Sequence, residues 1–197
     1  MTFWLLTGLL SAALLAAFSW GFFQLARGRL ALDLGWGRSR HALGPITVRV
    51  GAPREIVFET LQAPYTGRAP RGSGIEVIER GEELVVAAHH TPVHFYTSRT
   101  VEAVRFEPPE RITFRHLAGP VPEAFEEFTL REEDGETVIE YRGEIGIDFW
   151  WLGRLAGRLW VIPQWESKVR PHLEGIREPA EERAERRRAR EGRKATE

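Results

Sequence analysis

The first 26 residues of the chain contain no charged side chain. No Asp, Glu, Lys or Arg occurs from Met1 to Ala26, and the first charges are Arg27 and Arg29. As a helix rising 1.5 Å per residue, this stretch would be about 38 Å long, which exceeds the roughly 30 Å hydrocarbon core of a bilayer. Residues 1–26 therefore predict a transmembrane helix, and the lipid bilayer is the first partner that the sequence indicates.

A cleaved secretory signal is the alternative interpretation of this segment. Such signals begin with a cationic region and end at a small-x-small site, whereas here no Lys or Arg precedes the apolar run and Gln24 lies at the junction. Arg27, Arg29, Arg38 and Arg40 all follow the span, and basic residues at a span end tend to stay cytoplasmic. The sequence thus predicts a single-pass protein of the cell membrane with a cytoplasmic globular part. The absence of Cys fits a reducing compartment without requiring one.

The remaining residues, about 170, suffice for one domain and a tail. The chain is nearly neutral, with 27 Lys and Arg against 28 Asp and Glu, so its charge indicates no nucleic-acid partner. Residues 27–45 contain several glycines and predict a juxtamembrane linker, and residues 46–177 predict the domain. Residues 178–197 are a tail of Glu, Arg and Ala that we expect to extend a helix into solvent. Its arginines at 186–188 are either solvated or in contact with anionic headgroups.

Between linker and tail, the pattern of apolar residues is mostly that of strands. Residues 46–50 alternate as a strand does, and Pro53 followed by apolar residues at 56–61 predicts a helix that Pro64 ends. Six further alternating segments are separated by turn signals such as Asp134-Gly135: residues 75–79, 84–90, 93–106, 111–117, 125–131 and 137–147. Because the turns are short, the strands should be antiparallel.

From Phe149 the apolar period changes from two to about 3.6, which predicts a long helix that Pro163 kinks or splits. Leu155 and Leu159 are expected to face the sheet. The predicted stripe consists of Leu152, Leu155, Leu159, Ile162, Val169, Leu173 and Ile176. The fold class that follows is α+β: a curved antiparallel sheet of about six to seven strands around a long C-terminal helix, preceded by one transmembrane helix.

Three stretches resemble the START-like or polyketide-cyclase-like (SRPBCC) superfamily, also called the helix-grip fold. They are Val48 and Val50 before the helix start at 52–58, the segment Arg99 to Arg115 with its double-proline turn, and the hairpin 125–147 before the long helix. The resemblance covers about residues 45–176. It implies a cavity between sheet and helix that holds a lipid, a quinone, a polyketide or another apolar molecule, and it implies no particular chemistry.

With that resemblance, the ligand-binding residues are expected among inward-facing side chains of the sheet and of the long helix. They are Phe58, Phe95, Phe114, His116, Tyr141, Trp151, Leu155 and Leu159. The aromatic run 149–151 has three open interpretations: it lines the cavity mouth, dips into the membrane interface or plugs the core.

Histidines are the other residues that could bind a metal or take part in catalysis. His90, His94 and His116 lie on neighbouring predicted strands, and three converging imidazoles could hold zinc. Pro92 stands between the first two and should interrupt the strand, so we expect ordinary histidines, no metal and no cofactor. Glu126 and Glu127 are adjacent on a strand and should point to opposite faces, which argues against joint acid and base action.

Three functions are compatible with the sequence. The first is a membrane-tethered domain that binds or transfers a hydrophobic small molecule. The second is a cyclase or hydrolase type of enzyme in which His116, Tyr141 or Arg142 acts on an apolar substrate. The third is a protein-interaction module with a closed core and an unknown partner. A cavity of order 300 Å³ or more would favour the first two, and polar groups converging deep inside it would favour an enzyme.

Overall fold

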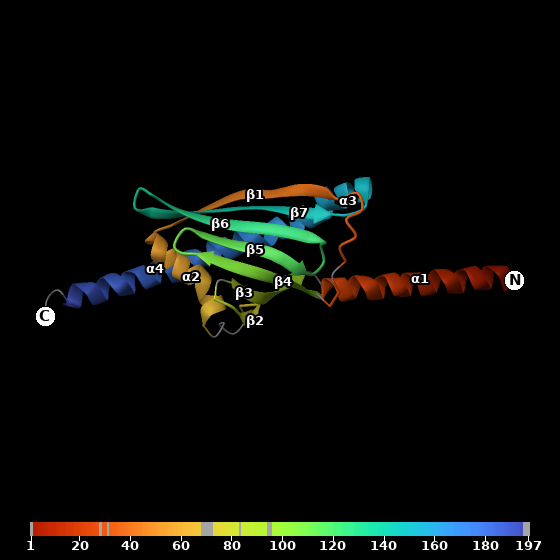
Figure 1. The fold of residues 1–197 in the computed structure, drawn as a ribbon, viewed down its shortest axis with the longest axis horizontal. Coiled ribbons are helices and arrows are strands. Elements are labelled where there is room, and N and C mark those ends of the chain that lie inside the picture. Colours follow the sequence, from red (N-terminus) through yellow and green to blue (C-terminus); the bar gives the residue numbers. More distant parts are fainter. Residues whose placement is uncertain are drawn as a thin grey trace.

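The computed structural model describes residues 2–27, 29–30, 32–67, 73–82, 84–93 and 96–194. It contains a single curved sheet of seven antiparallel strands with the order β1-β7-β6-β5-β4-β3-β2. Figure 1 shows the long helix α4 running along one face of this sheet, while α1 projects from one end of the domain. The elements are α1 (Thr2–Ala26), β1 (Ser39–Val50), α2 (Arg54–Thr66), β2 (Ile75–Arg80), β3 (Leu84–Val93), β4 (Tyr96–Glu107), β5 (Arg111–Ala118), β6 (Glu123–Glu133), β7 (Glu136–Ile147), α3 (Trp150–Ala156), the π-helical turn η1 (Gly157–Val161) and α4 (Ile162–Lys194).

The expected fold class is confirmed, and its physical basis is the period-two pattern of the strands. In β6 the side chains of Ala124, Glu126, Phe128 and Leu130 are buried while those between them are more exposed. Because one face of this strand is covered and the other faces solvent, its side chains alternate between core and surface. The same alternation brings carboxylates inward together with apolar residues.

Two helices cover the buried face of the sheet. From α2, Ile56, Val57 and Phe58 are buried, and the Phe58 ring meets Phe106 of β4 edge to face. From α4, a stripe at helical spacing packs on the same core: Trp165, Val169, Leu173, Ile176, Ala180 and Ala184. The domain therefore has one core between the sheet, α2 and α4.

The N-terminal helix lies outside this core. Its segment Phe3–Leu25 is long and apolar enough to cross a membrane, and the domain buries none of it. Only its C-terminal end touches the domain, where Phe22 and Phe23 pack against the ring of Tyr96 at centroid distances of 6.0 and 6.2 Å.

The structure moves three predicted boundaries. Strand β1 begins at Ser39, which pairs with Ile147, so residues 39–45 belong to the sheet and not to the linker. At the other end, Ala180 and Ala184 are buried, and the backbone N–H of Gly51 donates to Glu181 at 2.9 Å. The predicted tail thus packs on the domain through Ala184, because alanines are small enough to lie flat against α2. Helix α2 likewise continues past Pro64 to Thr66.

The expectation that Leu155 and Leu159 face the sheet is wrong. Their exposed fractions are 49% and 68%, and the residues turned toward the domain are Gly153 and Gly157. The physical reason is the π turn η1 directly before Pro163, which inserts one extra residue into the helix. A single 3.6-residue repeat therefore cannot describe the helix on both sides of that turn.

Candidate functional site

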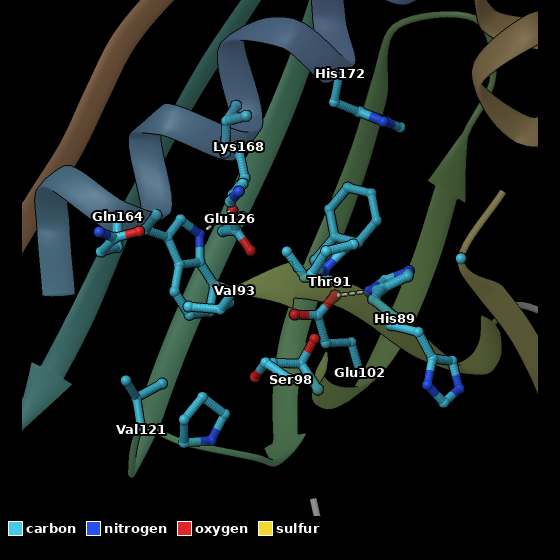
Figure 2. Close-up of a pocket in the computed structure, with 18 of the residues that line it drawn as sticks. His89, Thr91, Val93, Ser98, Glu102, Val121, Glu126, Gln164, Lys168 and His172 are labelled. Carbon is cyan, nitrogen blue, oxygen red and sulfur yellow. Dashed lines mark hydrogen bonds and ion pairs between the residues drawn. The ribbon is translucent and has the colours of Figure 1, made fainter. Parts of the chain in front are cut away.

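A cavity of about 430 Å³ lies between the buried face of the sheet and the first turns of α4 (Figure 2). Most of its wall is apolar, and one contributor comes from the N-terminal helix. The apolar and aromatic lining includes Phe22, Val93, Tyr96, Phe114, Val121, Phe128, Trp160 and Val169. A second hollow of about 660 Å³, at the end of α2, is lined by Arg80, Glu82 and Arg105 among others and is more polar.

Three polar side chains form a chain of hydrogen bonds at one wall of the cavity. The Tyr65 Oη lies 3.0 Å from His89 Nε2, and His89 Nδ1 lies 2.6 Å from a carboxylate oxygen of Glu102. Burial by itself would lower the pKa of His89, but the adjacent Glu102 carboxylate outweighs it and raises that pKa. Burial, followed by the charge of Glu102, raises the pKa of Tyr65. The arrangement links a phenol, an imidazole and a carboxylate through two protons.

A second buried carboxylate, Glu126, lies across the same cavity. It accepts hydrogen bonds from the Tyr141 hydroxyl at 2.6 Å and from Trp165 Nε1 at 2.8 Å. Burial, and next the charge of Glu102, raises the pKa of Glu126 to about 7. Close to neutral pH this group is therefore able to hold or release a proton.

Helix α4 supplies polar groups from the opposite wall. Gln164, Lys168 and His172 of α4 line the cavity together with Glu102 and Glu126 of the sheet, and Figure 2 shows the Lys168 side chain directed toward Glu126. The cavity thus combines an apolar wall with hydrogen-bond donors and acceptors on two sides.

The predicted ligand-binding residues divide into two groups, of which the first lies in or near the interior. Phe114 lines the cavity. Phe58 of α2 lies in the core, and Tyr141 lies behind Glu126, where it donates to that carboxylate. His116 lies beside Gly119 near the cavity end of β5 without lining the cavity, and burial lowers its pKa. Phe95 lies outside the described residues.

The second group points away from the cavity. Trp151 is 68% exposed, and Leu155 and Leu159 share its outward orientation. Because the two glycines of this helical segment occupy the side next to the sheet, the large side chains are left on the solvent side. These three residues form part of a surface and not of a cavity wall.

The polar groups that do line the cavity were absent from the expected site. Glu102 follows Ser98 and Thr100 on the buried face of β4, and Glu126 shares its face of β6 with Phe128. The sequence pattern could have identified both glutamates, because each lies an even number of residues from the inward-facing positions of its alternating strand. The expectation that Glu126 and Glu127 point to opposite faces is confirmed, since Glu127 pairs with Arg111 on the outer face at 3.8 Å.

Metal ligation is a separate question. Within the described ranges, no three His, Cys, Asp or Glu side chains are grouped so that they could share a metal ion. His90 pairs with Glu76 at 3.1 Å, and His94 lies outside the described residues.

Comparison with known proteins rests on shape. No protein-family model matches the chain, and no curated protein matches it. TTHA0849 from Thermus thermophilus has a TM-score of 0.57 at 17% identity, over 73% of this chain and 96% of that chain. The Zhui aromatase/cyclase from a Streptomyces species has a TM-score of 0.55 at 19% identity, over 74% and 95%. Norcoclaurine synthase from Thalictrum flavum has a TM-score of 0.51 at 11% identity, over 68% and 85%. With the sheet order and the long helix described above, these likenesses show that the chain has the helix-grip fold.

Proposed function

We propose that this protein binds a hydrophobic small molecule in the cavity between its sheet and α4 while held at a membrane by α1. The observation that carries the proposal is the cavity itself, about 430 Å³ with a mainly apolar wall. Sites for small molecules are typically of this size, mostly apolar, with a few placed polar groups. The cavity argues against the closed-core interaction module.

The polar side chains in the cavity indicate which chemical groups the ligand should carry. The cavity is mainly apolar, but Glu126 and the hydrogen-bonded chain of Tyr65, His89 and Glu102 line it. Lys168 lies at its border. Buried donors and acceptors favour a ligand that can hydrogen-bond to them. We therefore expect a mainly apolar molecule that carries a carbonyl or hydroxyl group, such as a lipid, a quinone or a polyketide-like compound.

The position of α1 supports delivery from the bilayer. Phe22, near the end of the apolar helix, lines the cavity, so the tether and the site adjoin. A molecule dissolved in the bilayer is then present at high effective concentration. We further propose that the domain is cytoplasmic. Arg38 and Arg40 are engaged in ion pairs with Glu123, Glu144 and Asp148, so Arg27 and Arg29 carry the positive-inside signal.

An enzyme of the cyclase or hydrolase type is the second candidate. The phenol, imidazole and carboxylate chain, facing a carboxyl whose pKa is about 7, is the specific observation that favours it. Groups that hold protons near neutral pH suit general acid and base catalysis. Two of the solved structures with this fold are named as an aromatase/cyclase and a synthase.

The test is to identify what the full chain retains. The protein is extracted in mild detergent, studied by native mass spectrometry, and its organic extract is compared with that of two variants. Val169→Trp should fill the cavity and remove the retained molecule, since Val169 lines it. Ile78→Trp adds the same ring at an exposed position of β2 and should leave the molecule bound.

The outcomes separate the candidates. A molecule present in the natural chain and in Ile78→Trp but lost from folded Val169→Trp supports binding in this cavity. Retention in folded Val169→Trp would refute it. Incubation of the protein with the identified molecule then distinguishes a carrier, which returns it unchanged, from an enzyme, which returns a product of altered mass or structure.

A further inference from the structure

The segment made of α3 and η1 packs on the domain through its small residues and turns its large apolar side chains outward, which is the reverse of the usual arrangement. Its small residues face the sheet: a Cβ on Gly153 would lie 1.9 Å from the carbonyl oxygen of Asp148, and a Cβ on Gly157 would lie 2.5 Å from the His41 ring. Its large apolar side chains face outward. In α4 the order is the usual one, with apolar residues inside and charges outside.

The outward side chains form a compact surface, which we call the apolar face: Trp151, Leu152, Leu155 and Leu159, all exposed. At 100° per residue, Trp151, Leu152 and Leu155 of α3 fall within about 100° of one another around the helix axis, and Arg154 falls along one border. Leu159 and Arg158 follow in η1, where both side chains are exposed. A soluble surface rarely leaves such a group of large apolar residues in water. An apolar stripe bordered by arginines is instead typical of a helix that lies in a membrane interface.

The apolar face lies at the end of the domain from which α1 departs. Figure 1 shows α3 and the domain-proximal end of α1 at the same end of the sheet, whereas the C-terminus of α4 lies at the opposite end. The linker between them is anchored there, because Asp148 accepts the backbone N–H groups of Leu34 and Gly35 at 3.0 Å. The linker itself exposes Leu30, Leu32, Leu34 and Trp36.

The same segment also borders the cavity. Trp160 of η1 and Val161 line it together with Phe22 of α1. The backbone N–H groups of Phe149 and Trp150 donate to the carbonyls of Trp36 and Gly37 at 2.7 and 2.9 Å, which joins α3 to the linker. The apolar face, the linker and this side of the cavity are therefore fixed relative to one another. All three lie near the end of α1 that joins the domain.

We infer that the apolar face of α3 and η1 rests in the headgroup and acyl boundary of the bilayer, with Arg154 and Arg158 on anionic headgroups, so that the cavity opens toward lipid. The inference deepens the proposed function and rests on it for the presence of the membrane. The alternative is that a second copy of the chain packs on the apolar face. The bilayer is favoured because the charged border and the neighbouring apolar helix both suit it.

The experiment uses the full chain in vesicles of phosphatidylcholine and phosphatidylglycerol. The natural chain has no cysteine, so single cysteines can be labelled with an environment-sensitive nitrobenzoxadiazole dye. Leu159→Cys reports on the apolar face, with Leu155→Cys as a second site on it. Leu14→Cys reports on α1, and Arg190→Cys, on the exposed far end of α4, reports on water. Nitroxide-bearing lipids and aqueous iodide serve as quenchers.

The expected result is that the dyes at 155 and 159 emit at shorter wavelength than the dye at 190 and lose most of their fluorescence to shallow nitroxide lipids. Lipid quenching that also requires phosphatidylglycerol, and that weakens in Arg154→Gln with Arg158→Gln, would support the role of the arginines. Dyes at 155 and 159 that iodide quenches as strongly as the dye at 190 would overturn the inference. So would blue-shifted dyes that nitroxide lipids do not quench, since a second copy would then cover the face.

The α1 reporter separates this inference from the proposed tether. Quenching at 14 without quenching at 155 and 159 leaves the tether standing and refutes the docked face. Quenching at 155 and 159 without quenching at 14 supports the docked face and refutes the span.

Discussion

At the scale of single residues, Glu126 best shows how burial changes chemistry. An exposed glutamate is ionised at neutral pH, but burial beside Glu102 raises the pKa of Glu126 to about 7. The two donors Tyr141 and Trp165 act in the opposite direction and keep the ionised form accessible. The residue is consequently a carboxyl group that can donate to, or accept from, a ligand near neutral pH.

The residue-scale prediction concerns stability against pH. A group whose pKa is raised on folding binds its proton more tightly in the folded state. The contribution of Glu126 to stability is therefore fully present below the unfolded pKa of 4.5 and is lost as pH rises through about 7. Glu126→Gln stays neutral and keeps an acceptor oxygen, so it should flatten this part of the fall and raise stability above pH 7. His89, whose pKa is also raised, contributes a fall of the same sign that remains.

Thermal unfolding of the full chain in detergent at pH 5 and pH 8 measures the effect. Glu127→Gln, one residue away on the outer face, is the matched control and should follow the natural chain. Equal loss of stability between the two pH values in the natural chain and Glu126→Gln would show that the carboxyl group is not the source.

At the scale of elements, the α3 and η1 segment shows that glycine can determine which side of a helix is inside. Gly153 lets the helix approach the backbone of Asp148 more closely than any side chain permits. Phe149 and Trp150 turn the chain from β7 into α3 with φ of 78° and 47°, a conformation that costs non-glycine residues about 1 kcal/mol or more each. The hydrogen bonds to Trp36 and Gly37 hold this turn in place.

The element-scale prediction compares an inward and an outward substitution. Gly153→Ala improves helix propensity by about 1 kcal/mol, yet it should destabilise the domain by about 1–3 kcal/mol net because a methyl group has no space against the Asp148 carbonyl. Leu159→Gln should change the unfolding free energy by no more than about 0.5 kcal/mol, since most of this residue is exposed to solvent.

Chemical denaturation in one detergent compares both variants with the natural chain. The inverted packing predicts a large loss for the glycine and a small one for the leucine. The reverse order would mean that Leu159 contacts the sheet as the helical repeat alone suggested.

At the scale of the whole molecule, the two ends of the domain differ in character. The apolar helix α1, the linker, α3 and one side of the cavity lie together at one end, while the β6–β7 turn and the C-terminal part of α4 lie at the other (Figure 1). In the proposed function, the first end faces the bilayer and the second faces water. The proposed orientation depends on Arg27 and Arg29, the basic residues directly after α1.

The molecule-scale prediction is that the domain is cytoplasmic. Arg190→Cys should react with a membrane-impermeant maleimide only after cells are lysed, whereas Thr2→Cys, before the span, should react in intact cells. Reaction at 190 in intact cells would reverse the orientation. Reaction at neither site before lysis would contradict a span through the cell membrane.

The sequence by itself determined the features that depend on local pattern. The absence of charge before Arg27 indicated α1, and the short turns between alternating segments indicated the antiparallel sheet. The alternation along β6 placed Glu126 and Glu127 on opposite faces. These properties follow from the geometry of one helix or one strand, so the order of residues is enough to predict them.

Only the tertiary structure decided the site and the orientation of α3. Tyr65, His89 and Glu102 come from α2, β3 and β4, and they meet because Glu102 lies opposite Ala87 in the register of β3 and β4, which no single segment specifies. The inward side of η1 depends on His41 of β1, whose ring a Cβ on Gly157 would meet, and this contact joins parts of the chain that are far apart in sequence. A repeat of apolar residues shows that a helix has a special side, but the surface available for close approach decides which side is buried.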